Sequence, residues 1–573
     1  MFDVVIRGGT IVDGTGEPAF VGDVAFVGGI IAAVGPNLGP GETEVDATGK
    51  MVTPGFVDMH THYDGQVTWD AHFTPSGWHG VTTVVMGNCG VGFAPCRAED
   101  RDWLINVMEG VEDIPGSALS EGIQWDWETF PEYMDAIDKH PHSIDFAVQV
   151  PHSALRGYVM GTHESETEQA TEAQVDEMKQ HLRASLDAGA LGFSTSRTAL
   201  HRTAAGVFVA GTFAEVSELK GIASALGEAG TGVFELADEH MAVPRDLSWL
   251  EEIAESTGRP VVFNLSQTDF ASDMWEQGLA GIESAAERGV PVFAQSAGRA
   301  IGILMTWRGT AHPFLLTDTW KRLAELPWDQ ALAELKTPET RAALLVEEAA
   351  DPTVFEAYIT QSWNKMFPLG ECNYEPAPEL SIAAQAKALG KSPKEIAYDM
   401  MMEEDGTGFI YFPLFNYSDG NLDLLHRMHT HPQVRMGLSD GGAHCGAICD
   451  GGMPTFMLTF WGRDRTRGPK LAVEHIIRRQ TLDTAVFYGL NDRGLLKPGY
   501  RADLNIIDYD NLRLGKPKMA FDLPAGGRRL IQRATGYVAT FVAGQQTMDN
   551  GVPTGVMPGR LVRGEQEMPA AAK

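Results

Sequence analysis

Short buried-type strands that alternate with helical stretches are the feature that most restricts the fold of this chain. From Met51 onward eight such strands can be counted, and each ends in polar residues. They are VTPGFVDMHTH, VTTVVMGNCG, IDFAVQVPHS, ALGFSTS, GVFELADE, PVVFNLSQ, VPVFAQSAG and VRMGLSDGG. Repeated strand and helix units join parallel strands. Eight of them predict an α/β fold with a (β/α)8 TIM barrel, in which the active site is assembled at the carboxyl ends of the strands.

The two ends of the chain have a different pattern. The first 50 residues contain short alternating runs broken by Gly, Asp or Pro-Gly, which is typical of strands and hairpins. Similar runs return after Leu482, in RADLNIIDYD and ATGYVATFVAGQQTMDNG. We therefore expect residues 1–52 and 483–573, the latter with a short C-terminal tail, to form one small β domain, and residues 53–482 to form the barrel.

A long segment separates the seventh strand from the eighth. It covers about residues 302–433 and includes the helical stretches TDTWKRLAEL and PELSIAAQAKALG. An ordinary barrel connection is much shorter, so we interpret the segment as a lid or subdomain over the barrel mouth. The alternative is a contact surface in a homo-oligomer.

The charge balance argues against nucleic acid and anionic membranes as partners. The chain has 44 Lys and Arg against 77 Asp and Glu, a formal net charge of −33, whereas phosphate binding needs clustered basic residues. No run of 18 apolar residues is present, and the N-terminus lacks the pattern of a signal peptide. Five cysteines are too few for a disulfide framework, so we expect a reducing, cytoplasmic setting.

Three strand ends carry residues suited to binding a metal. PGFVDMHTH places His60 and His62 two residues apart, so that both side chains point to the same side of a strand. Cys89 ends the second strand, where a thiolate could join them; a buried core cysteine is the alternative. Asp440 ends the eighth strand and could bind the metal and transfer a proton, although an Asp in an SDGG turn has a purely structural role equally often.

These motifs resemble the amidohydrolase superfamily, and more narrowly the N-acyl-D-amino-acid deacylases (D-aminoacylases). The resemblance runs from about residue 3 to 545 and rests on IVDGTG, PGFVDMHTHYD, GVTTVVMGNCG, PHSALR, AGALGFSTS, SDGG and DRGLLKPGYRADLNIIDYD. GNCG is the most specific motif, because most relatives use a modified lysine where D-aminoacylases use this cysteine. The resemblance implies a barrel, a flanking β-sandwich built from both termini, and zinc held by His60, His62, Cys89 and Asp440.

The resemblance fails at two strands. D-aminoacylases have a metal-binding histidine at the ends of strands five and six, and here Glu235, Asn264 and Gln267 are the nearest polar residues. Neutral amides are poor zinc ligands, so we expect one Zn²⁺ and an absent or weakened second site. Gln267 also stands where the family has a lysine that holds the substrate carboxylate. His240 and His444 are nearby but do not occupy the family positions.

Positive and polar groups after other strands are candidates for substrate binding. Arg156, Arg197 and Arg299 follow strands and could bind a carboxylate in a bidentate manner. The alternative is that each forms a structural ion pair. We add Gln267 and His444 to the candidates, His444 because it follows the aspartate, while His152 has the same ambiguity and Cys96 is expected to be structural.

The sequence thus predicts a metal-dependent amide hydrolase. We expect a metal-activated water, with Asp440 as general base and acid, and an N-acyl amino acid of the D type as substrate. One alternative is a hydrolase of a lactam, cyclic imide or ester on the same scaffold. Another is a non-catalytic scaffold that has kept the barrel.

Overall fold

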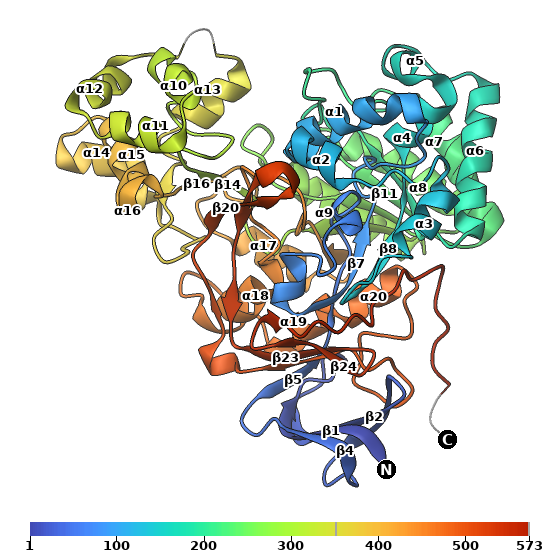
Figure 1. Cartoon of the computed structure of the whole chain (residues 1–573). Coiled ribbons are helices and arrows are strands. Elements are labelled where there is room, and N and C mark those ends of the chain that lie inside the picture. Colours follow the sequence, from blue (N-terminus) through green and yellow to red (C-terminus); the bar gives the residue numbers. More distant parts are fainter. Residues whose placement is uncertain (350–351, 571–573) are drawn as a thin grey trace.

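Parallel strands form the centre of the molecule. The computed structural model describes residues 1–349 and 352–570 (Figure 1). Its central strands pair in parallel within two sheets, β6-β7-β8 and β9-β10-β11-β12-β13-β17. Their bounds are β6 Phe56–Asp58, β7 Val81–Met86, β8 Asp145–Val148, β9 Val150–Pro151, β10 Gly192–Ser196, β11 Val233–Ala237, β12 Val261–Asn264, β13 Val292–Ser296 and β17 Val434–Met436. The predicted α/β alternation is therefore present.

Two connections link these sheets into one series. Only Gln149 separates β8 from β9 along the chain. At the other end, Thr61 forms a parallel bridge with Gly441, and the N–H of His62 donates to the carbonyl of Gly441 at 2.8 Å. The segments that carry His62 and Asp440 are thereby held next to each other.

Amphipathic helices cover the strands. Helix α6, for example, is capped by Thr171, which exchanges hydrogen bonds with Gln174. The helix buries Met178, Leu182 and Leu186 at helical spacing. No helix in residues 1–349 and 352–570 is long and apolar enough to cross a membrane. The helices are α1 Arg101–Glu112, α2 Gly116–Gly122, α3 Phe130–Ile137, α4 His152–Met160, α5 Thr162–Thr167, α6 Glu172–Asp187, α7 Val216–Ala229, α8 Val243–Thr257, α9 Met274–Glu287, α18 Met453–Phe456, α19 Val473–Gln480 and α20 Leu482–Phe487.

Both ends of the chain contribute to one nine-stranded sheet, drawn in blue and red in Figure 1. Its strands are β1 Phe2–Ile11, β2 Phe20–Val27, β3 Ile30–Gly35, β4 Gly41–Asp46, β5 Met51–Pro54, β18 Leu504–Ile507, β23 Tyr537–Val542, β24 Gln545–Asp549 and β25 Val552–Pro553. β5 and β18 join the two halves in antiparallel register, and apolar residues such as Ile6, Phe26 and Phe541 form its core. The expected boundary at 52/53 lies inside β5, and that at 482/483 lies inside α20.

The segment between β13 and β17 has its own hydrophobic core, which includes Trp307, Phe314 and Trp320. The helical stretches predicted from TDTWKRLAEL and PELSIAAQAKALG appear as α10 and α14, whereas an antiparallel sheet β14-β16-β15 was not expected. Figure 1 shows α10 to α16 as a distinct helical body beside the central strands. The elements of the whole segment between β13 and β17 are β14 Gly302–Met305, α10 Asp318–Ala324, α11 Trp328–Leu335, α12 Pro338–Val346, α13 Val354–Gln361, β15 Phe367–Pro368, α14 Ile382–Leu389, α15 Pro393–Met401, α16 Glu403–Gly406, β16 Ile410–Pro413 and α17 Asp423–Thr430.

Candidate metal centre and active site

Four predicted metal ligands converge at the carboxyl ends of the strands. One ligand atom from each of His60, His62 and Cys89 lies within 4.8 Å of the others. Cys89 Sγ is 3.3 Å from His60 Nε2, and Asp440 Oδ1 is 3.4 Å from His60 Nε2 and 3.8 Å from His62 Nε2. Ligands around a tetrahedral Zn²⁺ with bonds of about 2.0–2.3 Å are separated by about 3.3–3.8 Å. The contacts of His60 with Cys89 and with Asp440, and that of His62 with Asp440, therefore have the spacing of ligands around one divalent cation.

Two of these ligands lie in turns that use an unusual backbone conformation. Cys89 has φ 56° and Asp440 has φ 48°, both in the left-handed region that non-glycine residues rarely adopt. Gly90 follows with φ 71° and approaches β10 so closely that a Cβ would lie 2.8 Å from the Cα of Thr195. These turns direct the thiol and the carboxylate toward the histidines.

A chain of amide and carboxylate groups holds His60 and Cys89. His60 Nδ1 lies 3.1 Å from Gln295 Oε1, so this nitrogen is assigned the proton and Nε2 is left to face the other ligands. Gln295 Nε2 donates to Asn264 Oδ1 at 2.7 Å and to Glu235 Oε1 at 3.3 Å. The N–H of Cys89 donates to Glu235 Oε2 at 2.9 Å. Glu235 and Asn264 therefore support these two ligands through hydrogen bonds.

The electrostatics of this cluster favour a bound cation. Burial raises the pKa of the Cys89 thiol and of Asp440 well above their usual values, and raises the pKa of Glu235 to about 8. Burial also lowers the pKa of His60 to about 3, so the imidazole is neutral and can act as a ligand. Cys89, Asp440 and Glu235 are buried close together, so their charged forms need a positive charge nearby. A divalent metal would supply that charge. The donor set thus fits a metal in its chemistry as well as its spacing.

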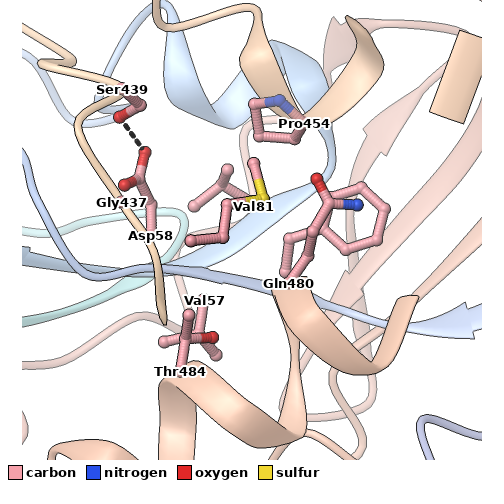
Figure 2. Close-up of a pocket in the computed structure, with 10 residues that line it drawn as sticks. Val57, Asp58, Val81, Gly437, Ser439, Pro454, Gln480 and Thr484 are labelled. Carbon is pink, nitrogen blue, oxygen red and sulfur yellow. Dashed lines mark hydrogen bonds between the residues drawn. The ribbon is translucent and has the colours of Figure 1, made fainter. Parts of the chain in front are cut away.

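Asp58 connects the first strand to the loop that carries Asp440. Its carboxylate accepts a hydrogen bond from the hydroxyl of Ser439, as Figure 2 shows, and its other oxygen accepts from the N–H of His60 at 3.3 Å. Burial raises the pKa of Asp58 to about 6. A cavity of about 20 Å³ beside it is lined by Val57, Val81 and other residues, which leaves room for about one water. We assign Asp58 to positioning the loop.

Comparison with known proteins identifies the family. The sequence profile of the amidohydrolase family matches residues 43–548. The chain belongs to the amidohydrolase family. It is therefore a hydrolase that acts on carbon–nitrogen bonds, and the resemblance to D-aminoacylase-like amidohydrolases is confirmed.

Relatives of this amidohydrolase match over nearly its whole length. It is 27% identical to the D-aminoacylase of Alcaligenes xylosoxydans xylosoxydans, covering 98% of this chain and 97% of the relative. It is 26% identical to the N-acyl-D-aspartate deacylase of the same organism, covering 98% and 95%. The solved N-acyl-D-glutamate deacylase of Bordetella bronchiseptica, complexed with zinc and a phosphonate inhibitor, has a TM-score of 0.65 at 23% identity and covers 98% and 99% of the two chains. At that identity the structural likeness shows the fold.

Two arginines predicted to bind substrate are engaged in buried ion pairs. Arg156 Nε donates to Glu218 Oε1 at 2.8 Å, and the same carboxylate lies 2.9 Å from His152 Nε2. Arg299, which is 1% exposed, donates to Asp450 Oδ1 at 2.8 Å and stacks on Tyr374. This placement matches the structural ion-pair alternative, and substrate binding by Arg156 and Arg299 stays a prediction.

The polar atoms of Gln267 also have partners, in a segment near the end of the insertion. Its carboxamide donates to Asp419 at 2.9 Å and accepts from the N–H of Ser418 at 3.0 Å, and its own N–H donates to Asn416 at 2.8 Å. These hydrogen bonds attach the insertion to the loop after β12, and substrate binding by Gln267 stays a prediction. Arg197, in contrast, has no carboxylate within ion-pair distance in the described ranges and donates only to the carbonyl of Thr212.

An apolar cavity of about 210 Å³ lies between the strand-end loops and the insertion. His240 belongs to its wall and packs against Phe415 with ring centroids 4.9 Å apart. Its lining includes no Lys or Arg and consists of Leu200, Glu239, His240, Met241, Thr268, Asp269, Phe270, Phe355, Tyr358, Leu414 and Phe415. The insertion thus forms part of the cavity wall.

Three residues near the centre were not predicted from the sequence. Gln295 ends the seventh predicted strand, so the rule of polar strand ends could have found it. His201 follows β10, with its Nδ1 2.9 Å from Ser196 Oγ, and burial lowers its pKa to about 3. Glu112 ends a helix, where no strand-end signal applies. His444 lies with its Nε2 3.8 Å from Asp440 Oδ2, as its proximity in sequence suggested.

Proposed function

We propose that this amidohydrolase cleaves the amide bond of an N-acyl amino acid or a related small amide, using one divalent metal, most simply Zn²⁺. The observation that carries the proposal is the convergence of His60, His62, Cys89 and Asp440. His60 Nε2 lies 3.3 Å from Cys89 Sγ and 3.4 Å from Asp440 Oδ1, which is 3.8 Å from His62 Nε2. A bound Zn²⁺ would polarise the substrate carbonyl and make water a better nucleophile at neutral pH.

The chain's own residues supply the proton transfers. Asp440 is the general base because its Oδ1 faces the histidines and its Oδ2 faces His444 Nε2 at 3.8 Å. It takes the proton from water and delivers it to the leaving nitrogen. His444 is 25% exposed at its side chain and lies where it can contact the substrate. Arg197 is the remaining arginine that could meet a substrate carboxylate.

The hydrogen bonds of Glu235 on β11 and Asn264 on β12 favour a single metal. Glu235 and Asn264 both use their oxygens to accept hydrogen bonds from Cys89 and Gln295. Amide oxygens bind Zn²⁺ poorly in any case. We therefore infer that these residues support one site instead of forming a second.

The surrounding architecture supports this reading of the site. We infer that β6 to β17 close into a (β/α)8 barrel, since Thr61 pairs with Gly441 and Gln149 alone separates β8 from β9. We also propose a β-sandwich domain from residues 1–54 and about 489–570, with the insertion at 302–433 forming a lid. Zinc as the metal, a cytoplasmic location, and contact between copies of the chain remain predictions.

The cavity favours an apolar group in the substrate. Its wall has no cationic side chain among the described residues, and apolar side chains from both the loops and the insertion surround it. We propose that it receives the larger apolar part of the amide. The same lack of cations favours a lactam or cyclic imide as the second candidate substrate, because such a ring needs no carboxylate partner.

A metal assay combined with a substrate panel tests the function. The purified protein should contain about one zinc per chain, and it should hydrolyse N-acyl-D-amino acids faster than their L forms. Turnover of cyclic amides alone would select the second candidate. Full hydrolysis by protein freed of metal would refute the metal-dependent mechanism.

A further inference from the structure

The carboxylate of Glu112, the last residue of α1, lies against two histidines of the metal centre. Its Oε1 is 3.3 Å from His62 Nδ1, and its Oε2 is 3.8 Å from His444 Nε2. The residue is 1% exposed. Within residues 1–349 and 352–570, neither carboxylate oxygen nor His62 Nδ1 has a hydrogen-bond partner of good geometry. A buried carboxylate without such bonds is costly, so its retention needs a reason.

The backbone around Glu112 is fixed to the loop that follows Asp440. The N–H of His444 donates to the carbonyl of Glu112. The next residue, Asp113, ends the helix at φ 53° and accepts hydrogen bonds from the N–H of Gly446 at 2.9 Å and the hydroxyl of Thr310 at 2.6 Å. These contacts hold the carboxylate at the centre and tie it to the loop that bears the catalytic aspartate.

The two sides of the His62 ring face different partners. Nε2 faces Asp440 Oδ1 at 3.8 Å, on the side of the other ligands, and Nδ1 faces Glu112. Histidine ligands commonly bind metal through one nitrogen and donate the other N–H to a carboxylate or a carbonyl, which fixes the ring and makes it a stronger donor. His60 has the equivalent contact with the neutral amide of Gln295 at 3.1 Å. His62 is thus the histidine ligand with an anionic partner.

We propose that Glu112 is a positioning residue that orients His62 as a metal ligand and holds His444 beside Asp440. The inference rests on the proposed metal-dependent function, but it concerns metal affinity and not the identity of the substrate. With Nε2 engaged as a ligand, the Nδ1–H of His62 would be a stronger donor toward the Glu112 carboxylate, whose Oε1 lies 3.3 Å away.

The test compares Glu112→Gln with Asp102→Asn, an exposed acid on the same helix. The dissociation constant for Zn²⁺ is measured by competition with a chelator, and thermal unfolding is measured on metal-free protein. We expect zinc affinity to fall about 10- to 100-fold in Glu112→Gln and to stay unchanged in Asp102→Asn. Metal-free Glu112→Gln should be at least as stable as the wild type, because the substitution removes a buried carboxylate.

Several outcomes separate this inference from its alternatives. Zinc affinity in Glu112→Gln within about threefold of the wild type would overturn it, as would lower stability of the metal-free variant with unchanged affinity. If Glu112→Gln does not fold, Glu112→Asp decides, since its shorter side chain draws back from His62 and should still weaken zinc binding. Wild-type protein that binds zinc and hydrolyses no amide would defeat the proposed function alone.

Discussion

The N–H of Cys89 donates a 2.9 Å hydrogen bond to the carboxylate of Glu235, a buried residue of β11. Through its other oxygen, Glu235 also accepts from Gln295, the partner of His60. One carboxylate therefore connects two of the proposed metal ligands, His60 and Cys89, which are 29 positions apart in the sequence.

Glu235 should give the metal-free protein a distinctive pH dependence. Burial raises its pKa from 4.5 to about 8, so between these values the folded state keeps a proton that the unfolded chain has released. The stability contributed by this group is therefore lost as pH rises from about 5 to 8. Glu235→Gln cannot titrate, so the wild type should lose stability relative to it over that range. Urea unfolding in the presence of chelator measures this, and parallel pH curves for the two proteins would contradict it.

Removal of the thiol ligand should weaken metal binding. Cys89→Ala leaves three ligands, and we expect zinc affinity to fall at least about 10-fold with hydrolysis falling in parallel. Cys96→Ala is the matched control, because Cys96 is also a buried free cysteine but does not belong to the cluster of His60, His62 and Cys89. Equal zinc content in both variants after dialysis would exclude Cys89 as a ligand.

Asp440→Asn should remove proton transfer. The amide cannot accept a proton from water, so we expect kcat to fall about 10²- to 10⁴-fold. Asp318→Asn, in an exposed position on α10, should retain wild-type activity. Zinc content is measured alongside the rate to separate lost chemistry from lost metal. A rate within a few-fold of the wild type would show that another group is the base.

A charged side chain introduced on the wall of the apolar cavity should weaken the binding of substrates with apolar groups. Met241 lies on its wall and is 49% exposed, so Met241→Asp can be accommodated without disturbing the core. We expect KM for substrates with apolar groups to rise about 10-fold with little change in kcat. Leu389→Asp, at the exposed end of α14, is the control and should leave KM unchanged. An equal KM in both variants would place the apolar group elsewhere.

The insertion should open without unfolding the central strands. Trp307 is buried in the insertion's own cluster, whereas Trp461 is buried in the main core. Trp307→Ala should cost about 3–5 kcal/mol locally and speed hydrogen exchange in α10 and α15, while zinc binding persists. Trp461→Ala should lower the stability of the main body instead. Uniform exchange in both variants would show that the two cores unfold as one unit.

The strands and the meeting of His60, His62, Cys89 and Asp440 were predictable because they depend on local patterns. Polar residues that follow buried strand runs marked His60, Cys89 and Asp440, and parallel strands bring such ends together. The roles of Arg156 and Arg299 were not predictable, because a strand-end position does not reveal that Glu218 and Asp450 pair with them from distant segments.

The position of Glu112 near the proposed metal ligands was also not predictable from local sequence. It lies 52 positions from His60 in the sequence at the end of an ordinary amphipathic helix, and its hydrophobic neighbours give the only local signal. Its function depends on how the helix end meets the loop after Asp440, which is a tertiary contact. Similarly, the sheet β14-β16-β15 joins segments about 100 residues apart, so no short window of sequence could indicate it.

The attachment of Gln267 to Asn416, Ser418 and Asp419 has a consequence for how this enzyme can be altered. The hydrogen-bond donors and acceptors of the loop after β12 are paired with those of residues 416–419, near the end of the insertion. A graft that imports only one of them from a relative would separate donors from acceptors and misalign the cavity wall. Chimaeras designed to change selectivity should therefore exchange the two segments together.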